Sequence, residues 1–328
     1  TFYKKEATAQ QPATSKEEGN LGACSGPDIK ATFDKQSGLL TSYLYKKHEY
    51  ILNGQGPRPF FWRAPTDNDY GANLPVRLKA WKEASYQEPK AESFQVTPGS
   101  NATTVKVTYR FPQTDARWDI TYKIYASGVI KVDNRALAAG DQAPMIPRVG
   151  LRLQLPDSFT DLTYYGRGPK ENYRDRRTSQ FIGEYAIPVK DMFEPYVRPQ
   201  ENNHRTDIYW CALTDKTQRG LLLIADRTFE LNASNYPLES MDSGDTIDNG
   251  APRTEKTHHR HLTDPLPEKM VDLFIDYRMM GVGGDDSWGA TAHEPYLIRP
   301  GKENAIEYGF SLVPFDKKED YKYLIRQY

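Results

Sequence analysis

Strict alternation of apolar and polar residues, broken by turn residues, is the feature that most limits the fold of this chain. The run Val105–Phe111 places its valines and aromatic residues on one face and its charged residues and threonine on the other. The run Trp118–Ile124 repeats the pattern, and Ala126 to Gly128 supplies a turn before the next run, Val129–Val132. Period two is the geometry of a β-strand with one buried face. Short connections between such runs indicate consecutive antiparallel strands.

Runs of the same kind cover much of the chain, and helical patterns are few. Further strands are predicted at Leu39–Tyr45, Gly150–Leu155, Leu221–Ile224, Val271–Tyr277 and Ala305–Leu312. The 22 tyrosines agree with this, because aromatic side chains favour pleated, half-buried surfaces. One helix is predicted over Pro75–Ala84, with proline in its first turn. The expected fold class is therefore all-β, a many-stranded antiparallel β-sandwich.

The two ends of the chain differ from its middle. Residues 1–26 are rich in Ala, Gln, Thr, Lys, Glu and Gly and lack apolar periodicity, which predicts a linker or the end of a preceding domain. Residues 27–315 are expected to form the sandwich domain, and residues 316–328 a C-terminal tail, either a short polar helix or an exposed segment. Because the chain begins at Thr1 rather than Met, we expect it to be part of a longer protein.

Charge and cysteine content exclude several classes of function. The 43 basic and 44 acidic residues give a formal net charge of −1, so no excess charge attracts nucleic acid or an anionic membrane surface. No apolar run approaches the ~20 residues of a membrane-spanning helix. Cys24 and Cys211 cannot form a disulfide framework or a zinc site alone. Cys211 lies in an apolar run and is expected to be a small buried hydrophobic residue.

Five polar, glycine-bearing segments between the predicted strands are candidates for function, since binding residues usually lie on loops of a rigid scaffold. They are Phe61–Gly71, Tyr165–Arg176, Pro195–His204, His258–His261 and Gly281–Gly289. Between them, the segments carry arginine, acidic and amide side chains together with a few aromatic rings. Such groups bind paired sugar hydroxyls and stack on the apolar face of a pyranose. The alternative is structural, because dense arginine and carboxylate loops also tie β proteins together through buried ion pairs.

Other readings of these segments are weaker. Gly166–Pro169 is not a phosphate loop, because no Lys-Ser/Thr pair and no helix pattern follow it. The stretch from Asp67 resembles the start of a calcium loop, but Gly71 is misplaced and the final glutamate is missing. His258–His261, with Asp67 as a third donor, is one histidine cluster without a second half. We therefore expect no metal site in this chain.

The five segments carry a family resemblance over roughly residues 27–315. The sequence resembles the small-chain domain, the C-terminal domain of family 2 glycoside hydrolase β-galactosidases. The matching motifs, in order, are Phe61–Asp69, Gly168–Tyr173 with Asp175-Arg176, Tyr196–Asn202, His259–Leu262 and Gly283–Trp288. The sequence departs from the family pattern at Asn203-His204, where glycine is common.

The resemblance implies both a fold and a context. The fold is a galactose mutarotase-like β-supersandwich. In the family, this domain follows a sugar-binding jelly roll, immunoglobulin-like domains and a barrel that carries both catalytic glutamates, so no catalytic residue is expected here. A retaining glycosidase needs two carboxylates about 5–5.5 Å apart. The isolated chain is expected to be inactive and without cofactor, whereas the complete enzyme often uses Mg and Na in other domains. A homo-oligomer is possible, and a periplasmic or cytoplasmic bacterial location stays open.

The resemblance also implies site residues. Trp288 matches the family tryptophan that reaches into the active-site mouth and stacks on the sugar, while Asp285 and Asp286 are expected to brace its loop. The remaining motif residues are expected in or behind the same concave face: Arg63, Asp67, Asn68, Glu171, Asn172, Arg174, Glu201, Asn202, His259 and His261.

Two other functions remain open at this point. One is a free mutarotase-like sugar epimerase that uses histidine and glutamate as acid and base; His259, His261, Glu171 and Glu201 are available for it. The other is a non-catalytic carbohydrate-binding module. The leading hypothesis is the β-galactosidase domain, with a galactoside and the catalytic barrel as its partners.

Overall fold

The computed structural model describes residues 11–138, 145–243, 261–286, 288–299, 301–317 and 319–327. Antiparallel strands dominate this part of the chain, and the secondary-structure class predicted from the alternating runs is confirmed. No helix among the described residues is long and apolar enough to cross a membrane.

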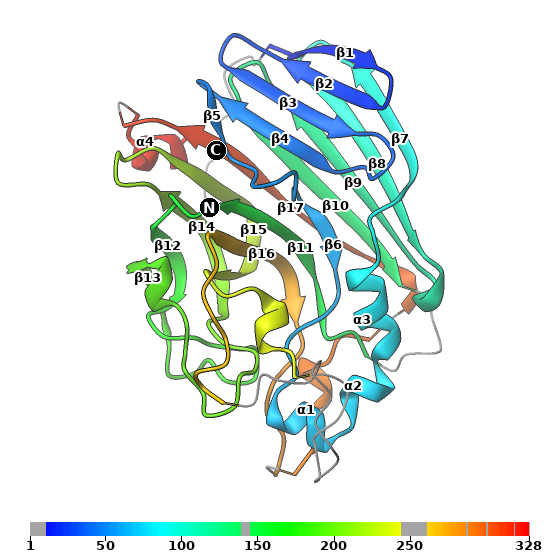
Figure 1. Ribbon diagram of the computed structural model, residues 1–328, viewed down its shortest axis with the longest axis vertical. Helices are drawn as coiled ribbons and strands as arrows, with labels where there is room; N and C mark the ends of the chain where they lie inside the picture. Colours follow the sequence, from blue (N-terminus) through cyan, green and yellow to red (C-terminus); the bar gives the residue numbers. More distant parts are fainter. Residues whose placement is uncertain are drawn as a thin grey trace.

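A small sheet covers one side of the molecule (Figure 1). Its strands, in spatial order, are β1 (Thr14–Glu18), β2 (Leu21–Ser25), β3 (Ile29–Asp34), β4 (Leu40–Tyr45) and β5 (His48–Glu49). Residues 1–26 were predicted to be a linker or the end of a preceding domain; in the structure, Thr14–Ser25 forms β1 and β2, and β2 pairs with β3 along its whole length. No side chain of β1 is buried, so this strand has no apolar face that the sequence pattern could show.

A twelve-stranded sheet makes up the rest of the β structure. Its strands are β6 (Arg58–Phe60), β7 (Ala91–Pro98), β8 (Thr103–Phe111), β9 (Ala116–Ile124), β10 (Ile130–Ala138), β11 (Arg148–Pro156), β12 (Asp161–Gly168), β13 (Phe181–Pro188), β14 (Arg205–Thr214), β15 (Gly220–Ser234), β16 (Met270–Met279) and β17 (Gly301–Phe315). The main path runs β13-β12-β14-β15-β17-β10-β9-β8-β7, while β6, β11 and β16 branch from it.

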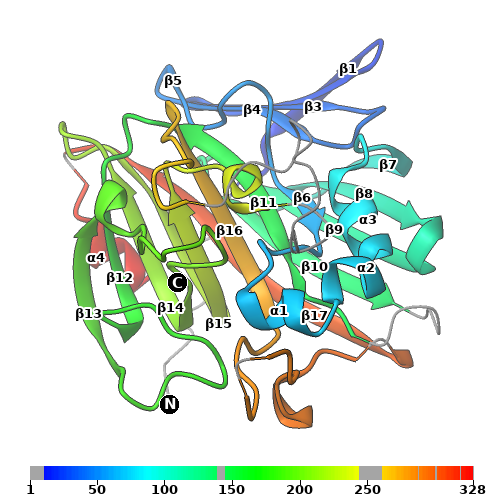
Figure 2. The same cartoon turned by 60° about the horizontal axis from the view of Figure 1, so that its bottom comes forward.

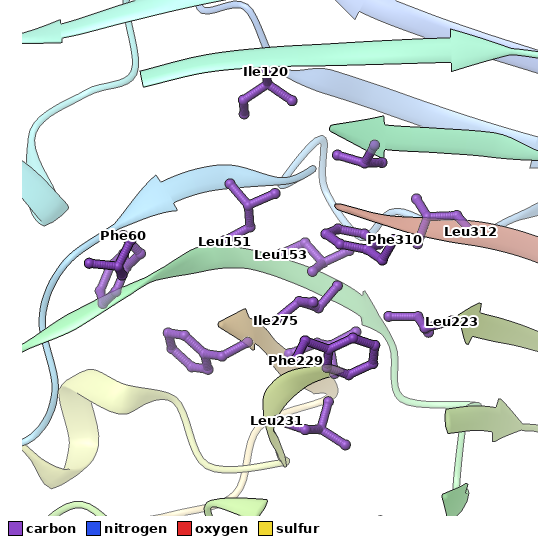
Figure 3. Close-up of a cluster of buried hydrophobic side chains, with 14 of the residues drawn as sticks. Phe60, Ile120, Leu151, Leu153, Leu223, Phe229, Leu231, Ile275, Phe310 and Leu312 are labelled. Carbon is purple, nitrogen blue, oxygen red and sulfur yellow. The ribbon is translucent and has the colours of Figure 1, made fainter. Parts of the chain in front are cut away.

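Strand β15 divides this sheet into two layers. Its first half, Gly220–Ala225, pairs with β17, and its second half, Glu230–Ser234, pairs with β16. The sheet therefore curls back on itself, and the main core fills the space between the layers. Figure 3 shows this packing, with Ile120 of β9, Leu151 of β11 and Phe310 of β17 pointing into one cluster of buried side chains.

The described residues also form four short α-helices and four 3₁₀ helices, all of which lie between strands except α4, which follows the last strand. They are α1 (Asp67–Gly71), α2 (Leu74–Arg77), α3 (Lys79–Tyr86), α4 (Tyr321–Ile325), η1 (Pro112–Thr114), η2 (Val189–Asp191), η3 (Leu238–Met241) and η4 (Glu294–Tyr296). The helix predicted over Pro75–Ala84 is interrupted at Leu78, whose φ of −111° and ψ of 16° lie outside the helical range. The C-terminal tail forms α4, and its side chains pack on a second cluster that includes Trp210 and Phe315.

Candidate functional site

Four of the five segments singled out in the sequence meet at the end of the molecule that carries α1 and α2. Figure 2 shows these helices beside the orange segment between β16 and β17. The side chain of Arg63 reaches that segment, donating from Nη1 to the carbonyl of Met280 over 2.7 Å and from Nη2 to the carbonyl of Gly281 over 3.1 Å. Asp175 reaches the same segment from the loop after β12. Side chains from distant parts of the sequence thus hold one loop.

Arg63 is the central brace of this end. Its guanidinium is fully buried and makes a two-pronged ion pair with Asp69, over 2.9 Å from Nε and 2.8 Å from Nη2. Burial alone would lower the pKa of Arg63, but the Asp69 carboxylate outweighs it and raises the pKa. Asp69 also completes a capping box with Thr66 at the start of α1. With every arm of Arg63 bonded inside the protein, its side chain fixes α1 against the loop and does not face a ligand.

The loop Gly281–Ala290 is anchored along its length. The Asp175 carboxylate accepts hydrogen bonds from the backbone N–H of Val282 over 3.1 Å and of Gly283 over 2.7 Å. Farther along, the Asp286 carboxylate accepts from the backbone N–H of Trp288 over 2.8 Å. Backbone hydrogen bonds from Ala290, over 3.0 Å, and from Trp288 lower the pKa of Asp286, because they stabilise its ionised form.

Close packing against α1 fixes the tip of this loop. Gly289 has a φ of +121°, and a Cβ atom there would lie 2.2 Å from the backbone carbonyl carbon of Gly71. Only glycine meets both conditions. The adjacent Trp288 is 84% exposed, so a large aromatic side chain stands in solvent on a firmly held backbone.

Polar residues at the start of α1 lie at the same end. Asp67 is exposed and accepts from Arg198 over 3.3 Å and from Gln200 over 3.1 Å. The Arg198 guanidinium also lies over the ring of Tyr70, 5.2 Å from its centroid. Asn68 is half-buried. Among the predicted site residues at this end, Asp67, Asp285, Asp286 and Trp288 are exposed and Asn68 is half-buried, so these have surface available to a ligand.

The side chains of Glu171 and Asn172 form hydrogen bonds within the protein and stabilise its loops. The Glu171 carboxylate accepts from Tyr196, Arg176 and, over 2.7 Å, the backbone N–H of Asn203. Asn172 is fully buried, and both ends of its amide are bonded inside the protein.

Asn202 is buried in the same way and spans its own loop. Its Oδ1 accepts from the backbone N–H of Glu194 over 3.2 Å, and its Nδ2 donates to the carbonyl of Gln200 over 2.9 Å. Asn203, where the family commonly has glycine, has a φ of +61°. Asparagine tolerates this left-handed conformation, so the loop keeps a backbone geometry that glycine also adopts readily.

A buried charge network lies behind this end, and the sequence pattern did not reveal it. His204 is fully buried, with Nδ1 2.6 Å from Oδ1 of Asn232 and Nε2 3.1 Å from Glu230. Glu201 accepts from Asn232 over 2.9 Å, and Arg174 donates to Glu230 over 2.8 Å.

The pKa values of this network are shifted by burial and by the neighbouring charges. Burial raises the pKa of the Asp276 carboxyl to about 7, although Arg148, with Nε 3.3 Å away, opposes the shift. Burial disfavours the charged form of His204, but its hydrogen bond to Glu230 raises the pKa. Burial likewise opposes the ionisation of Glu230, and the bonds from His204 and Arg174 lower its pKa.

Of the segment His258–His261, the structure describes only His261. His259 lies outside the described residues. His261 is exposed and pairs with Asp264, and no contact joins it to Glu171 or Glu201 in the described part. Arg174 lines a different groove. Within the part of the chain that the structure describes, no group of three or more His, Cys, Asp or Glu side chains is placed to hold a metal ion.

Comparison with known proteins shows that the chain is similar to one part of β-galactosidases. Residues 25–312 match the family model described as beta galactosidase small chain. A beta-galactosidase of Priestia megaterium is 34% identical over 83% of this chain and 25% of its own length. One of Lactobacillus delbrueckii subsp. bulgaricus is 32% identical over 91% of this chain and 28% of its own. The chain thus spans about a quarter of the length of these curated relatives.

Solved structures support the expected fold. The galactose 1-epimerase of Lactobacillus acidophilus superposes with a TM-score of 0.50 at 6% identity, over 94% of this chain and 99% of the epimerase. At this identity the likeness concerns the fold alone, which is mutarotase-like as the resemblance implied. The family match over most of the sequence leads to the conclusion that this chain belongs to the beta-galactosidase small chain family.

Proposed function

We propose that this chain is the C-terminal domain of a β-galactosidase and that Trp288 completes the mouth of the active site by stacking on the galactoside. The observation that carries the proposal is the contrast between the exposed indole and its rigid support. Exposed tryptophan leaves a large apolar surface in water, which is unfavourable unless a partner or ligand covers it. Arg63, Asp175 and the contact of Gly289 with Gly71 hold that surface in one position.

The chemical step is assigned to another part of the complete protein. Retaining glycosidases use two carboxylates about 5–5.5 Å apart on either side of the scissile bond. Here Glu171, Glu201 and Asp69 are engaged in buried hydrogen bonds, and Asp285 pairs with His293 over 2.7 Å at the surface. We therefore expect the catalytic pair on a barrel domain of the same chain, together with any Mg or Na that the complete enzyme uses. The isolated chain should be inactive.

Substitution of Trp288 in the complete protein tests this proposal. Trp288→Ala should weaken binding of a nitrophenyl β-galactoside by about 1–3 kcal/mol, or roughly 5- to 150-fold, mostly in KM. The melting temperature should stay within about 2 °C of the parent value, since an exposed side chain contributes little to the core. The matched control is Phe181→Ala, which removes another exposed aromatic ring, 71% accessible, from β13.

The two measurements together decide the role of Trp288. An unchanged KM in Trp288→Ala, or an equal change in Phe181→Ala, would remove the sugar-stacking role. A large drop in melting temperature with unchanged KM would make Trp288 a structural residue.

A further inference from the structure

A polar groove lies on the twelve-stranded sheet, at the point where β15 stops pairing with β17. Ala225 of β15 is the last residue paired with β17, and Glu230 is the first paired with β16. The N-terminal half of β17 is left with β10 as its neighbour, and a groove of about 700 Å³ opens beside it. Residues of β8, β9, β10, β15, β16 and β17 line this groove, together with Arg174 from the loop after β12. Its volume falls within the range of small-molecule sites, about 300–1,000 Å³.

Two carboxylates that line the groove, Asp133 and Asp226, are held in place by lysines that lie next to it. Lys131 lies 3.3 Å from Asp133 and also pairs with Asp226, while Lys123 donates to Asp133 over 3.0 Å. Gly309 makes room for this cluster, because a Cβ atom there would lie 2.4 Å from a carboxylate oxygen of Asp226. Acceptors fixed in this way lose little conformational freedom when they bind a ligand.

The walls add aromatic groups. The half-buried rings of Tyr277 and Tyr308 line the groove, with centroids 6.1 Å apart. Ordered acceptors and aromatic rings together suit a hydroxyl-rich ligand.

Charge balance indicates that the ligand is neutral. The lining contains four cationic and four acidic side chains, namely Lys106, Arg135, Arg174 and Arg227 against Asp119, Asp133, Asp226 and Glu307. Most of them are paired with other side chains of the protein, as Arg135 is with Glu307 over 3.3 Å at the surface. A balanced wall provides no net field for an anion or a cation.

We propose that this groove is a second carbohydrate-binding site, which takes a neutral oligosaccharide chain. Arg174 lines the groove and precedes Asp175, the brace of the Trp288 loop, so the two sites are adjacent in the sequence at this point. The class of ligand rests on the proposed function, whereas the position of the site rests on the groove itself. The groove would bind part of a longer saccharide, separately from the galactose unit that is cleaved at the active site.

A blocking substitution tests the groove without removing an existing contact. Thr121 of β9 is half-buried and lines the groove, so Thr121→Trp should fill it. The control is Thr104→Trp on β8, a half-buried threonine on the same sheet face that does not line the groove. A second variant, Arg227→Ala, removes an exposed lining side chain that has no ion pair among the described residues.

Binding is measured on the complete protein by its retardation in native gels that contain a soluble neutral galactan. The parent and Thr104→Trp should be retarded equally, while Thr121→Trp should lose about tenfold or more in apparent affinity and Arg227→Ala about threefold. Hydrolysis of a nitrophenyl β-galactoside should be unchanged in all three variants, since that small substrate does not need the groove.

Three outcomes would overturn this inference: no retardation of the parent, equal retardation of Thr121→Trp, or retardation only by an anionic polysaccharide. If galactan binding follows the groove but no form of the protein hydrolyses the galactoside, the groove is supported and the proposed function fails. If the protein hydrolyses the galactoside but does not bind galactan, the proposed function is supported and the groove is not a carbohydrate-binding site.

Discussion

Asp175 offers a sharp test of how the Trp288 loop is held. Its carboxylate accepts two backbone hydrogen bonds, from Val282 over 3.1 Å and from Gly283 over 2.7 Å. Asp175→Ala removes both, while Asp175→Asn retains one neutral acceptor oxygen. The anchors from Arg63 to the carbonyls of Met280 and Gly281 remain in both variants. The substitution should therefore loosen the loop without unfolding the domain.

The size of the effect follows from these contacts. A hydrogen bond to a charged group contributes about 1.5–3 kcal/mol, and the lower end applies because the loop amides can bind water once the loop opens. Two such bonds give about 3 kcal/mol, or roughly a 150-fold rise in the open population of the loop. Asp175→Asn should lose about three quarters of this free energy, since it keeps one of the two hydrogen bonds and a neutral hydrogen bond is about half as strong as a charged one.

Native-state hydrogen exchange of the complete protein measures how often the loop opens, and steady-state kinetics measure the effect of that opening on sugar binding. Exchange of the peptide that contains Val282 and Gly283 should accelerate, and KM for a galactoside should rise, in the order parent, Asp175→Asn, Asp175→Ala. The control is Asp161→Ala, since the exposed side chain of Asp161 contacts only its neighbour Thr160 among the residues that the structure describes. Faster exchange with unchanged KM, or unchanged exchange in Asp175→Ala, would refute the link between this brace and sugar binding.

Two further predictions concern the buried carboxyl and the loop glycine. Burial raises the pKa of Asp276 from 3.8 to about 7. The protonated Asp276 carboxyl therefore stabilises the folded protein fully below pH 3.8, and this stabilisation is lost as the pH rises through 7. The raised pKa of His204 changes the stability in the same direction. Urea titration measures the free energy of unfolding, which should fall less between pH 5 and 8 in Asp276→Asn than in the parent protein. An equal fall in both proteins would contradict the raised pKa of Asp276. Gly289→Ala should raise KM and lower the melting temperature, because its Cβ would clash with Gly71; Gly54→Ala, with a φ of +74° but no atom within 3.7 Å, measures the backbone strain alone. Equal effects of the two substitutions would show that the clash is unimportant.

The strands of the fold were predictable where one face is buried. The predicted run Val105–Phe111 lies within β8, and Trp118–Ile124 lies within β9, with the alternate residues buried as expected. Strand β1 escaped prediction because none of its side chains is buried, so pairing alone holds it in the sheet. The break of the helix at Leu78 escaped as well, since local helix propensity does not reveal a bend that packing imposes.

The candidate site shows a similar division. The segments that meet around α1 were identifiable from their unusual polar composition, and the exposure of Trp288 agrees with its predicted presentation on a loop. The roles of individual residues were not identifiable, since Arg63, Asn172 and Glu201 are buried braces. Whether an arginine faces a ligand or a carbonyl depends on atoms more than two hundred residues away, such as the carbonyl of Met280.

The sequence by itself determined the β class, the family and the loops where chemistry collects, because alternation and motif composition are local properties of the chain. Tertiary structure alone decided that β15 splits between two layers, that His204 lies in a buried network with Glu230, and that a groove opens beside Gly309. The physical reason is that burial and hydrogen-bond partners depend on distances between strands. Polar residues on those strands have the same sequence pattern whether they face water or line a binding site.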